Sequence, residues 1–259
     1  MGYCLGVFAG MLPHPPPRLS VNLNKVALLR NARTIGIPSV LHAARQCLAA
    51  GANGITVHPR PDQRHIRPDD VYELPNVLQD YPDAEYNIEG NPFTGDFMDL
   101  VRAVRPDQCT LVPDDPAQST SDHGWNAEHD RRRLQPIIKE LQDLGIRVSL
   151  FMDADQPLIE GIAALRPERI ELYTEPYAAA FGTPAEDAQW QRFHQAAVAA
   201  HAQGLGVNAG HDLNVDNLPR FVHIPHILEC SIGHALIADA LTDGLANTVR
   251  RYQQALRGM

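Results

Sequence analysis

Two histidines and one glutamate stand at comparable places in this sequence, each at the end of a short run with strand-like composition. They are His58, Glu89 and His211. Histidine changes its charge near neutral pH, and a nearby carboxylate can exchange protons with a substrate. A single strand-end histidine is as often a hydrogen-bonded structural residue as a catalyst. Two of them from separate strands, with a glutamate between them along the chain, favour general acid–base catalysis.

The segment after His58 is basic and cannot continue the strand. Pro59 and Pro61 interrupt the backbone pattern, and Arg60 and His65 follow in the same segment. Guanidinium and imidazole groups in a loop of this kind suit a phosphorylated or otherwise anionic small molecule. The alternative interpretation is an ordinary solvated basic loop.

A second place suits an anion. Gly233 and His234 open the last helix, and the backbone N–H groups at a helix N-terminus bind phosphate. Gly210 lets the backbone near Asp212 approach a ligand closely. We therefore expect one phosphate site near Asp212 and Gly233–His234, while Arg33 and the basic loop could hold a second anionic group.

The elements that position these residues alternate regularly. Strands are expected over residues 20–25, 54–58, 85–89, 108–113, 147–153, 169–174, 206–211 and 227–232. Helices are expected over residues 39–50, 68–79, 94–104, 128–143, 155–164, 184–203, 214–221 and 234–256. Strict alternation predicts a parallel sheet, and eight repeats in 259 residues predict a closed (β/α)8 TIM barrel. An open doubly wound sheet would want GxGxxG after the first strand, and this motif is missing.

A barrel brings the C-terminal ends of its strands to one mouth. Polar residues are expected there from all eight strands, namely Asn22, Asn24, Lys25, His58, Arg60, Glu89, Thr120, Asp153, Glu171, Thr174, Asn208, His211, Gly233 and His234. Asp153 is read as a cap of the following helix, and Arg30, Asn31 and Arg33 are expected in a loop after the first strand.

Composition limits the other possibilities. The net charge of −9 argues against a general nucleic-acid binder, which would carry a basic face. No apolar run approaches the length of a membrane span, and four scattered cysteines fit reduced thiols in a cytoplasmic protein. Neither HxH nor HExxH occurs, so we expect no catalytic metal. Residues 1–19 are interpreted as a flexible extension and residues 20–259 as the catalytic barrel.

The chain resembles the pyridoxine 5'-phosphate synthase family of vitamin B6 biosynthesis. The resemblance runs in order from about residue 20 to the C-terminus. It is carried by Leu29-Arg30-Asn31-Ala32-Arg33, Gly54-Ile-Thr-Val-His58, Arg64-His65-Ile66, Asn87-Ile88-Glu89, Val207-Asn208-Ala209-Gly210-His211 and Ile232-Gly233-His234-Ala235.

This resemblance implies a cytoplasmic homo-octamer of barrels without cofactor. It implies condensation of 1-deoxy-D-xylulose 5-phosphate with 3-amino-2-oxopropyl phosphate to pyridoxine 5'-phosphate, phosphate and water. His58 and Glu89 are then the proton acceptors and His211 the proton donor. The implied contacts to the amino ketone phosphate are Asn22, Arg33, Asp212, Gly233 and His234. Those to the sugar phosphate are Asn24, Lys25, Arg60, His65 and Thr120.

The sequence departs from the family at the presumed site. Many members have Asp-His at Asn24-Lys25, glycine at Asp212 and glycine at Glu175. A carboxylate beside a phosphate is unfavourable unless its side chain points away. Two other functions stay open: a non-catalytic paralogue that binds a phosphorylated metabolite, and a barrel lyase or isomerase with a Schiff-base lysine, for which only Lys25 qualifies.

Overall fold

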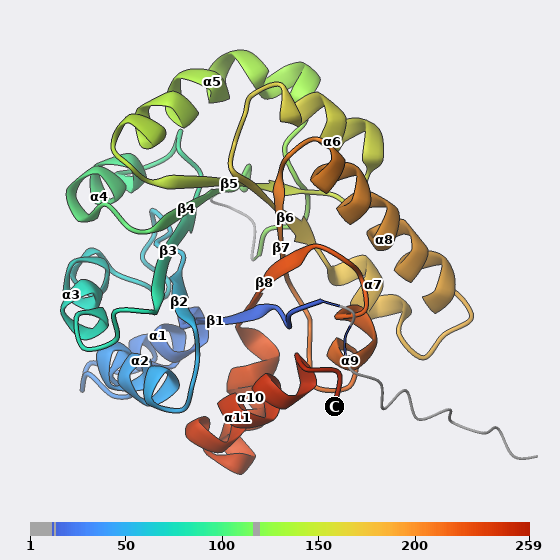
Figure 1. Ribbon diagram of the computed structural model, residues 1–259. Coiled ribbons are helices and arrows are strands. Elements are labelled where there is room, and N and C mark those ends of the chain that lie inside the picture. The colour runs from blue at the N-terminus through green and yellow to red at the C-terminus, as the bar shows by residue number, and fades with distance from the viewer. Residues whose placement is uncertain (1–11, 13, 116–119) are drawn as a thin grey trace, which may run out of the picture.

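Eight parallel strands form a closed barrel in the computed structural model, which describes residues 12, 14–115 and 120–259. The strands are β1 (Arg18–Asn22), β2 (Gly54–Val57), β3 (Glu85–Gly90), β4 (Gln108–Leu111), β5 (Arg147–Met152), β6 (Arg169–Tyr173), β7 (Gly206–Gly210) and β8 (Ile227–Ile232). Each strand pairs with the next along the chain, and β8 pairs with β1 (Figure 1). The predicted (β/α)8 barrel is thus confirmed, and the open sheet is excluded.

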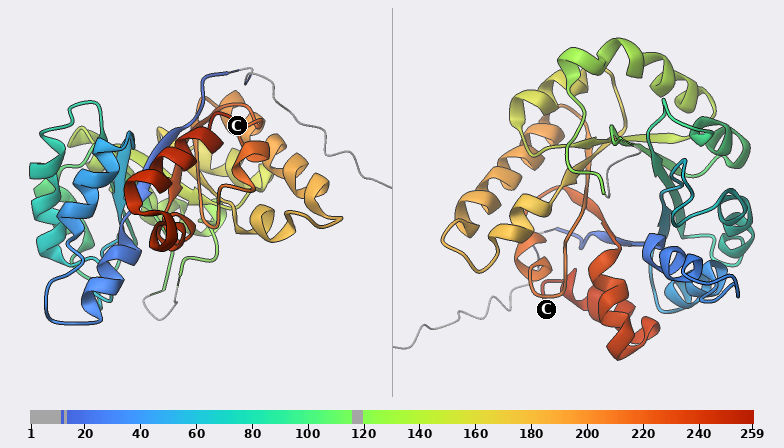
Figure 2. Two further views of the ribbon diagram at one scale, coloured as in Figure 1. Left: turned by 90° about the horizontal axis from the view of Figure 1, so that it is seen from below. Right: turned by 180° about the vertical axis from the view of Figure 1, so that it is seen from behind.

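Helices form a ring around the barrel, as the views from below and behind also show (Figure 2). They are α1 (Asn24–Asn31), α2 (Val40–Ala49), α3 (Pro68–Leu78), α4 (Phe97–Val104), α5 (Ala127–Asp143), α6 (Gln156–Ala163), α7 (Glu175–Ala180), α8 (Glu186–Ala202), α9 (Leu218–Phe221), α10 (His234–Asp243) and α11 (Leu245–Ala255). Within the described ranges, no helix is both long and apolar enough to cross a membrane.

Local sequence explains several helix ends. The Ser39 hydroxyl accepts a hydrogen bond from the His42 N–H at 3.2 Å and caps α2. Pro68 begins α3, where its missing N–H is not needed. Gly244 divides the helix expected over residues 234–256 into α10 and α11, because its φ of +76° lies outside the helical region.

The first strand and its loop were predicted wrongly. The strand ends at Asn22, and Asn24, Lys25, Arg30 and Asn31 belong to α1. The Asn22 side chain accepts a hydrogen bond from the Asn24 N–H at 2.9 Å, which turns the chain out of the strand. Most of the expected extension lies outside the described residues, although β1 already includes Arg18 and Leu19.

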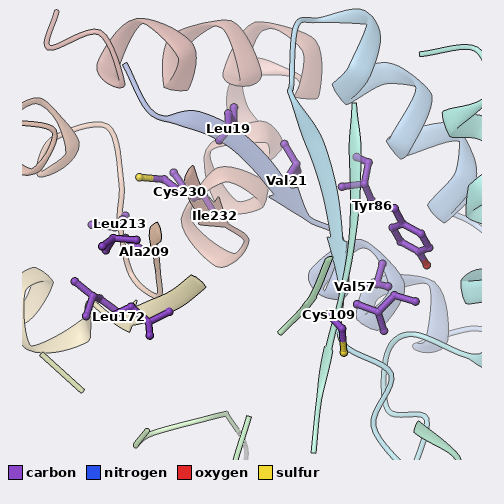
Figure 3. Close-up of a cluster of buried hydrophobic side chains, with 14 of the residues drawn as sticks. Leu19, Val21, Val57, Tyr86, Cys109, Leu172, Ala209, Leu213, Cys230 and Ile232 are labelled. Atoms are coloured by element: carbon purple, nitrogen blue, oxygen red, sulfur yellow. The ribbon is translucent and has the colours of Figure 1, made fainter. Parts of the chain in front are cut away.

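The hydrophobic core lies mainly between the strands and the helices. Alternate strand residues such as Leu19, Val21 and Ile232 are buried and apolar, and Figure 3 shows them in this layer. The intervening residues are polar. Asn208 on β7 donates to Gln108 on β4 at 3.3 Å, and because these strands are not neighbours, the contact crosses the barrel interior. The interior is therefore polar, unlike the aliphatic layers usual in such barrels.

Candidate active site

A cavity of about 330 Å³ opens at the C-terminal ends of the strands. It is lined by Asn22, Asn24, Lys25, His58, Arg60, His65, Glu89, Thr120, Ser121, Glu171, His211, Asp212, Ser231, Gly233 and His234. Every residue predicted for catalysis or substrate binding lies in this lining except Arg33, which is exposed in the loop after α1. Three other residues expected at the mouth, Asp153, Thr174 and Asn208, do not line the cavity. The binding role of Arg33 stays a prediction.

His58 is held at the end of β2 by groups from three other segments. Its backbone N–H donates to Asn24 Oδ1 at 2.9 Å. Its Nε2 lies 3.2 Å from Asp114 Oδ2, whereas its Nδ1 lies 4.0 Å from Glu89 Oε2. One ring nitrogen of His58 is therefore hydrogen-bonded, and the other faces a carboxyl group beyond hydrogen-bonding distance.

Glu89 is buried at the end of β3, where its surroundings favour the protonated form of its carboxyl group. Burial raises its pKa well above the ordinary value, and the neighbouring carboxyl groups of Glu171, Glu229 and Asp114 raise it further. The side-chain amides of Asn87 and Asn22 donate to its two oxygens at 3.4 and 3.5 Å. The site therefore disfavours a negative charge on Glu89, and the protonated form of this residue can donate a proton.

Glu171 lies deeper, within β6. Burial raises its pKa to about 8, with a further contribution from Glu229, and its Oε2 has no hydrogen-bond partner among the described residues. A Cβ atom at Gly210 would lie 2.4 Å from Glu171 Oε1, closer than atoms can pack. The absence of a side chain at Gly210 therefore leaves room for the Glu171 carboxyl group.

His65 is a neutral hydrogen-bond donor. Burial lowers its pKa to about 3, and the positive charges of His58, Arg60, Arg64 and Lys25 act in the same direction. Its Nδ1 accepts the Ile66 N–H at 2.9 Å, so the ring proton is on Nε2. That N–H is available to an oxygen of a ligand in the cavity.

His211 sits on a strained turn after β7. Its φ is +85° and that of Asp212 is +57°, a region that glycine adopts freely and aspartate tolerates. The rings of Tyr173 and Phe151 pack against the imidazole at 5.1 and 5.2 Å. Burial lowers the pKa of His211 to about 4, against the opposing effect of Asp212, so these surroundings favour the neutral imidazole.

Two regions of the lining suit anions. Gly233 and His234 begin α10, whose N-terminal N–H groups point out of the helix. Arg60 is buried, and its Nη2 lies 2.8 Å from Asp114 Oδ2, while Lys25 is exposed at the mouth. Both regions therefore offer hydrogen-bond donors that an anion could bind.

Sequence reasoning missed Asp114, Ser121 and Ser231 as site residues. Asp114 could have been found, since it directly follows the fourth predicted strand. Over residues 12, 14–115 and 120–259, no group of three or more histidine, cysteine or acidic side chains is arranged to hold a metal ion.

Comparison with known proteins identifies the family. The family model described as "Pyridoxal phosphate biosynthesis protein PdxJ" matches residues 19–258. The chain belongs to this family. A pyridoxine 5'-phosphate synthase of Albidiferax ferrireducens is 56% identical over 245 residues, covering 92% of this chain and 97% of the relative. One of Xanthomonas campestris pv. campestris (strain B100) is 53% identical over 247 residues, with coverages of 93% and 96%.

Membership of the PdxJ family makes the chain an enzyme of pyridoxine biosynthesis and confirms the resemblance found in the sequence. Among solved structures, phosphoribosyl anthranilate isomerase from Thermotoga maritima has a TM-score of 0.61 at 13% identity. The match covers 94% of this chain and 100% of the isomerase. A likeness at this identity shows the shared barrel fold alone.

Proposed function

We propose that this enzyme condenses 1-deoxy-D-xylulose 5-phosphate with 3-amino-2-oxopropyl phosphate to give pyridoxine 5'-phosphate, phosphate and water. The main support for the proposal is that His58, Glu89 and His211 line the same cavity as the two regions that suit anions. Imine formation, loss of phosphate, loss of water and ring closure all require proton transfers at different atoms. Two histidines and a carboxyl group can supply them.

The two anion-binding regions match two phosphorylated substrates. The amino ketone phosphate would bind Asn22, the backbone at Asp212 and the start of α10 at Gly233–His234, with Arg33 as a further contact. The sugar phosphate would bind at Asn24, Lys25, Arg60, His65 and Thr120. The neutral Nε2–H of His65 and the cationic Arg60 are both suitable donors to phosphate oxygens.

Substrate binding would also reset the protonation of the site. A phosphate dianion near His211 would favour its charged form and raise its pKa above about 4. His211 can then donate a proton, as the family resemblance implies. Burial raises the pKa of Glu89, which makes its ionised form a stronger base for the proton-accepting role that the resemblance implies.

The proposal extends to a cytoplasmic homo-octamer that works without metal or organic cofactor. The deciding experiment mixes purified protein with both phosphorylated substrates and EDTA, and follows pyridoxine 5'-phosphate by chromatography together with released phosphate. Formation of both products at equal rates supports the synthase. Binding of substrates with neither product formed would instead support the non-catalytic paralogue.

The remaining alternative, a barrel lyase or isomerase that uses Lys25 as a Schiff-base lysine, can be tested separately. If Lys25 forms a Schiff base, borohydride reduction in the presence of substrate leaves a stable adduct on that residue, which peptide mass mapping detects. Lys25 lies on α1 rather than on a strand end and is exposed, whereas lysines that form Schiff bases are activated in desolvated pockets or beside another cationic group. We expect no adduct.

A further inference from the structure

Asp114 has no role in the site predicted from the sequence, but in the structure it contacts both His58 and Arg60. It follows β4, is 5% exposed, and accepts from two residues of the segment after β2 through the same oxygen, Oδ2. His58 Nε2 lies 3.2 Å away and Arg60 Nη2 lies 2.8 Å away. Its backbone is fixed as well, because the side-chain amide of Asn91 donates to the Asp114 carbonyl at 2.9 Å.

The carboxyl group of Asp114 is ionised. Burial favours its neutral form, but the hydrogen bond from His58 and the charges of His58 and Arg60 outweigh burial and lower its pKa. An ionised carboxylate can only accept hydrogen bonds. The Nε2 of His58 must therefore carry a proton whenever this contact is made.

We propose that Asp114 is a positioning residue that holds His58 in its Nε2–H tautomer, leaving Nδ1 as the nitrogen that accepts the substrate's proton. This inference rests on the proposed function, in which His58 acts as a base. Nδ1 faces Glu89 Oε2 at 4.0 Å, and both residues line the cavity. A substrate atom can therefore contact both.

In the proposed step one proton moves from the substrate to His58. A C–H, N–H or O–H bond of the substrate breaks, and its electron pair stays on the substrate. The Nδ1 lone pair forms the new N–H bond, so His58 becomes an imidazolium. Its Nε2–H stays on the Asp114 carboxylate, which places a negative charge next to the new positive one and stabilises it.

The test measures the tautomer directly. Nitrogen-15 NMR of histidine-labelled full-length protein, at a pH where the ring is neutral, distinguishes protonated Nε2 from protonated Nδ1, and His58→Gln assigns the resonance. We expect Nε2–H in the wild-type protein. In Asp114→Asn the amide can donate to Nε2, so Nδ1–H should become populated. We expect kcat to fall by roughly 10²- to 10⁴-fold, with a much smaller change in KM.

Two variants separate this role from a general structural one. Asp114→Glu keeps the carboxylate and should retain Nε2–H and recover part of kcat, which also covers the case that Asp114→Asn folds poorly. Asp62→Asn removes a carboxylate from the same loop as Arg60, but one whose side chain is 47% exposed and paired with Arg64. It should change neither the tautomer nor kcat.

Other results overturn the proposal. Nδ1–H in the wild-type protein refutes the assignment of the basic nitrogen. A lower kcat in Asp114→Asn with an unchanged tautomer means that Asp114 has only a structural role. A changed tautomer with unchanged kcat means that Nδ1 is not the base. If the wild-type protein forms no product, the proposed function fails, but the NMR experiment still tests the tautomer.

Discussion

Replacing Glu171 by glutamine should stabilise the protein, and by an amount that depends on pH. The pKa of this buried acid is raised from 4.5 to about 8, so between those values the folded state keeps a proton that the unfolded state has released. The contribution of Glu171 to the free energy of unfolding is therefore fully present below pH 4.5 and is lost as the pH rises toward 8. At about 1.4 kcal/mol per pH unit, the loss is about 3 kcal/mol at pH 7.

Glutamine has nearly the same shape but does not titrate, so Glu171→Gln should escape this loss. Urea unfolding of both proteins at several pH values between 4.5 and 8 gives the difference in unfolding free energy. We expect the unfolding free energy of the variant to increase relative to that of the wild-type protein by about 3 kcal/mol between pH 4.5 and pH 7. The exposed Glu73 on α3 provides the same substitution as a control and should show no such trend. A difference for Glu171→Gln that is constant with pH would refute the reasoning.

Three further substitutions test the site. His58→Ala should lower kcat by at least 10²- to 10⁴-fold with an unchanged circular dichroism spectrum; full activity would remove His58 from the mechanism. Arg33→Ala should raise KM by roughly 10- to 100-fold for one phosphorylated substrate only, since a charged hydrogen bond is lost. If the KM for each substrate is the same in the variant as in the wild-type protein, Arg33 does not bind either phosphate. Gly210→Ala places a Cβ atom 2.4 Å from Glu171 Oε1 and should cost about 1–3 kcal/mol, seen as a lower melting temperature; an unchanged melting temperature would mean that the interior adapts freely.

The strands could be predicted from the sequence because their apolar residues recur with the period of a sheet. Alternation of strands and helices then determined the barrel, and the barrel determined which strand ends meet. This is why His58, Glu89 and His211, far apart in sequence, were correctly expected in one place.

The remaining features depend on contacts that no local pattern reveals. Helix α1 was missed because Asn22 and Asn24 continue the polar alternation of the strand, although the Asn22 side chain turns the chain. Asp114 was missed because its partners, His58 and Arg60, come from another strand. The protonation of Glu89 and His211 was also beyond the sequence, since burial is the main cause of both pKa changes.

The polar barrel interior separates two kinds of evolutionary constraint within each strand. Residues such as Leu19 and Val21 face the helices and must preserve volume, whereas Ser20 between them binds Thr56 at 2.7 Å and must preserve hydrogen bonding. Odd and even positions can therefore diverge independently. Chemistry inside the barrel can change without repacking the layer that supports it, so new substrates can be accommodated while the fold keeps its stability.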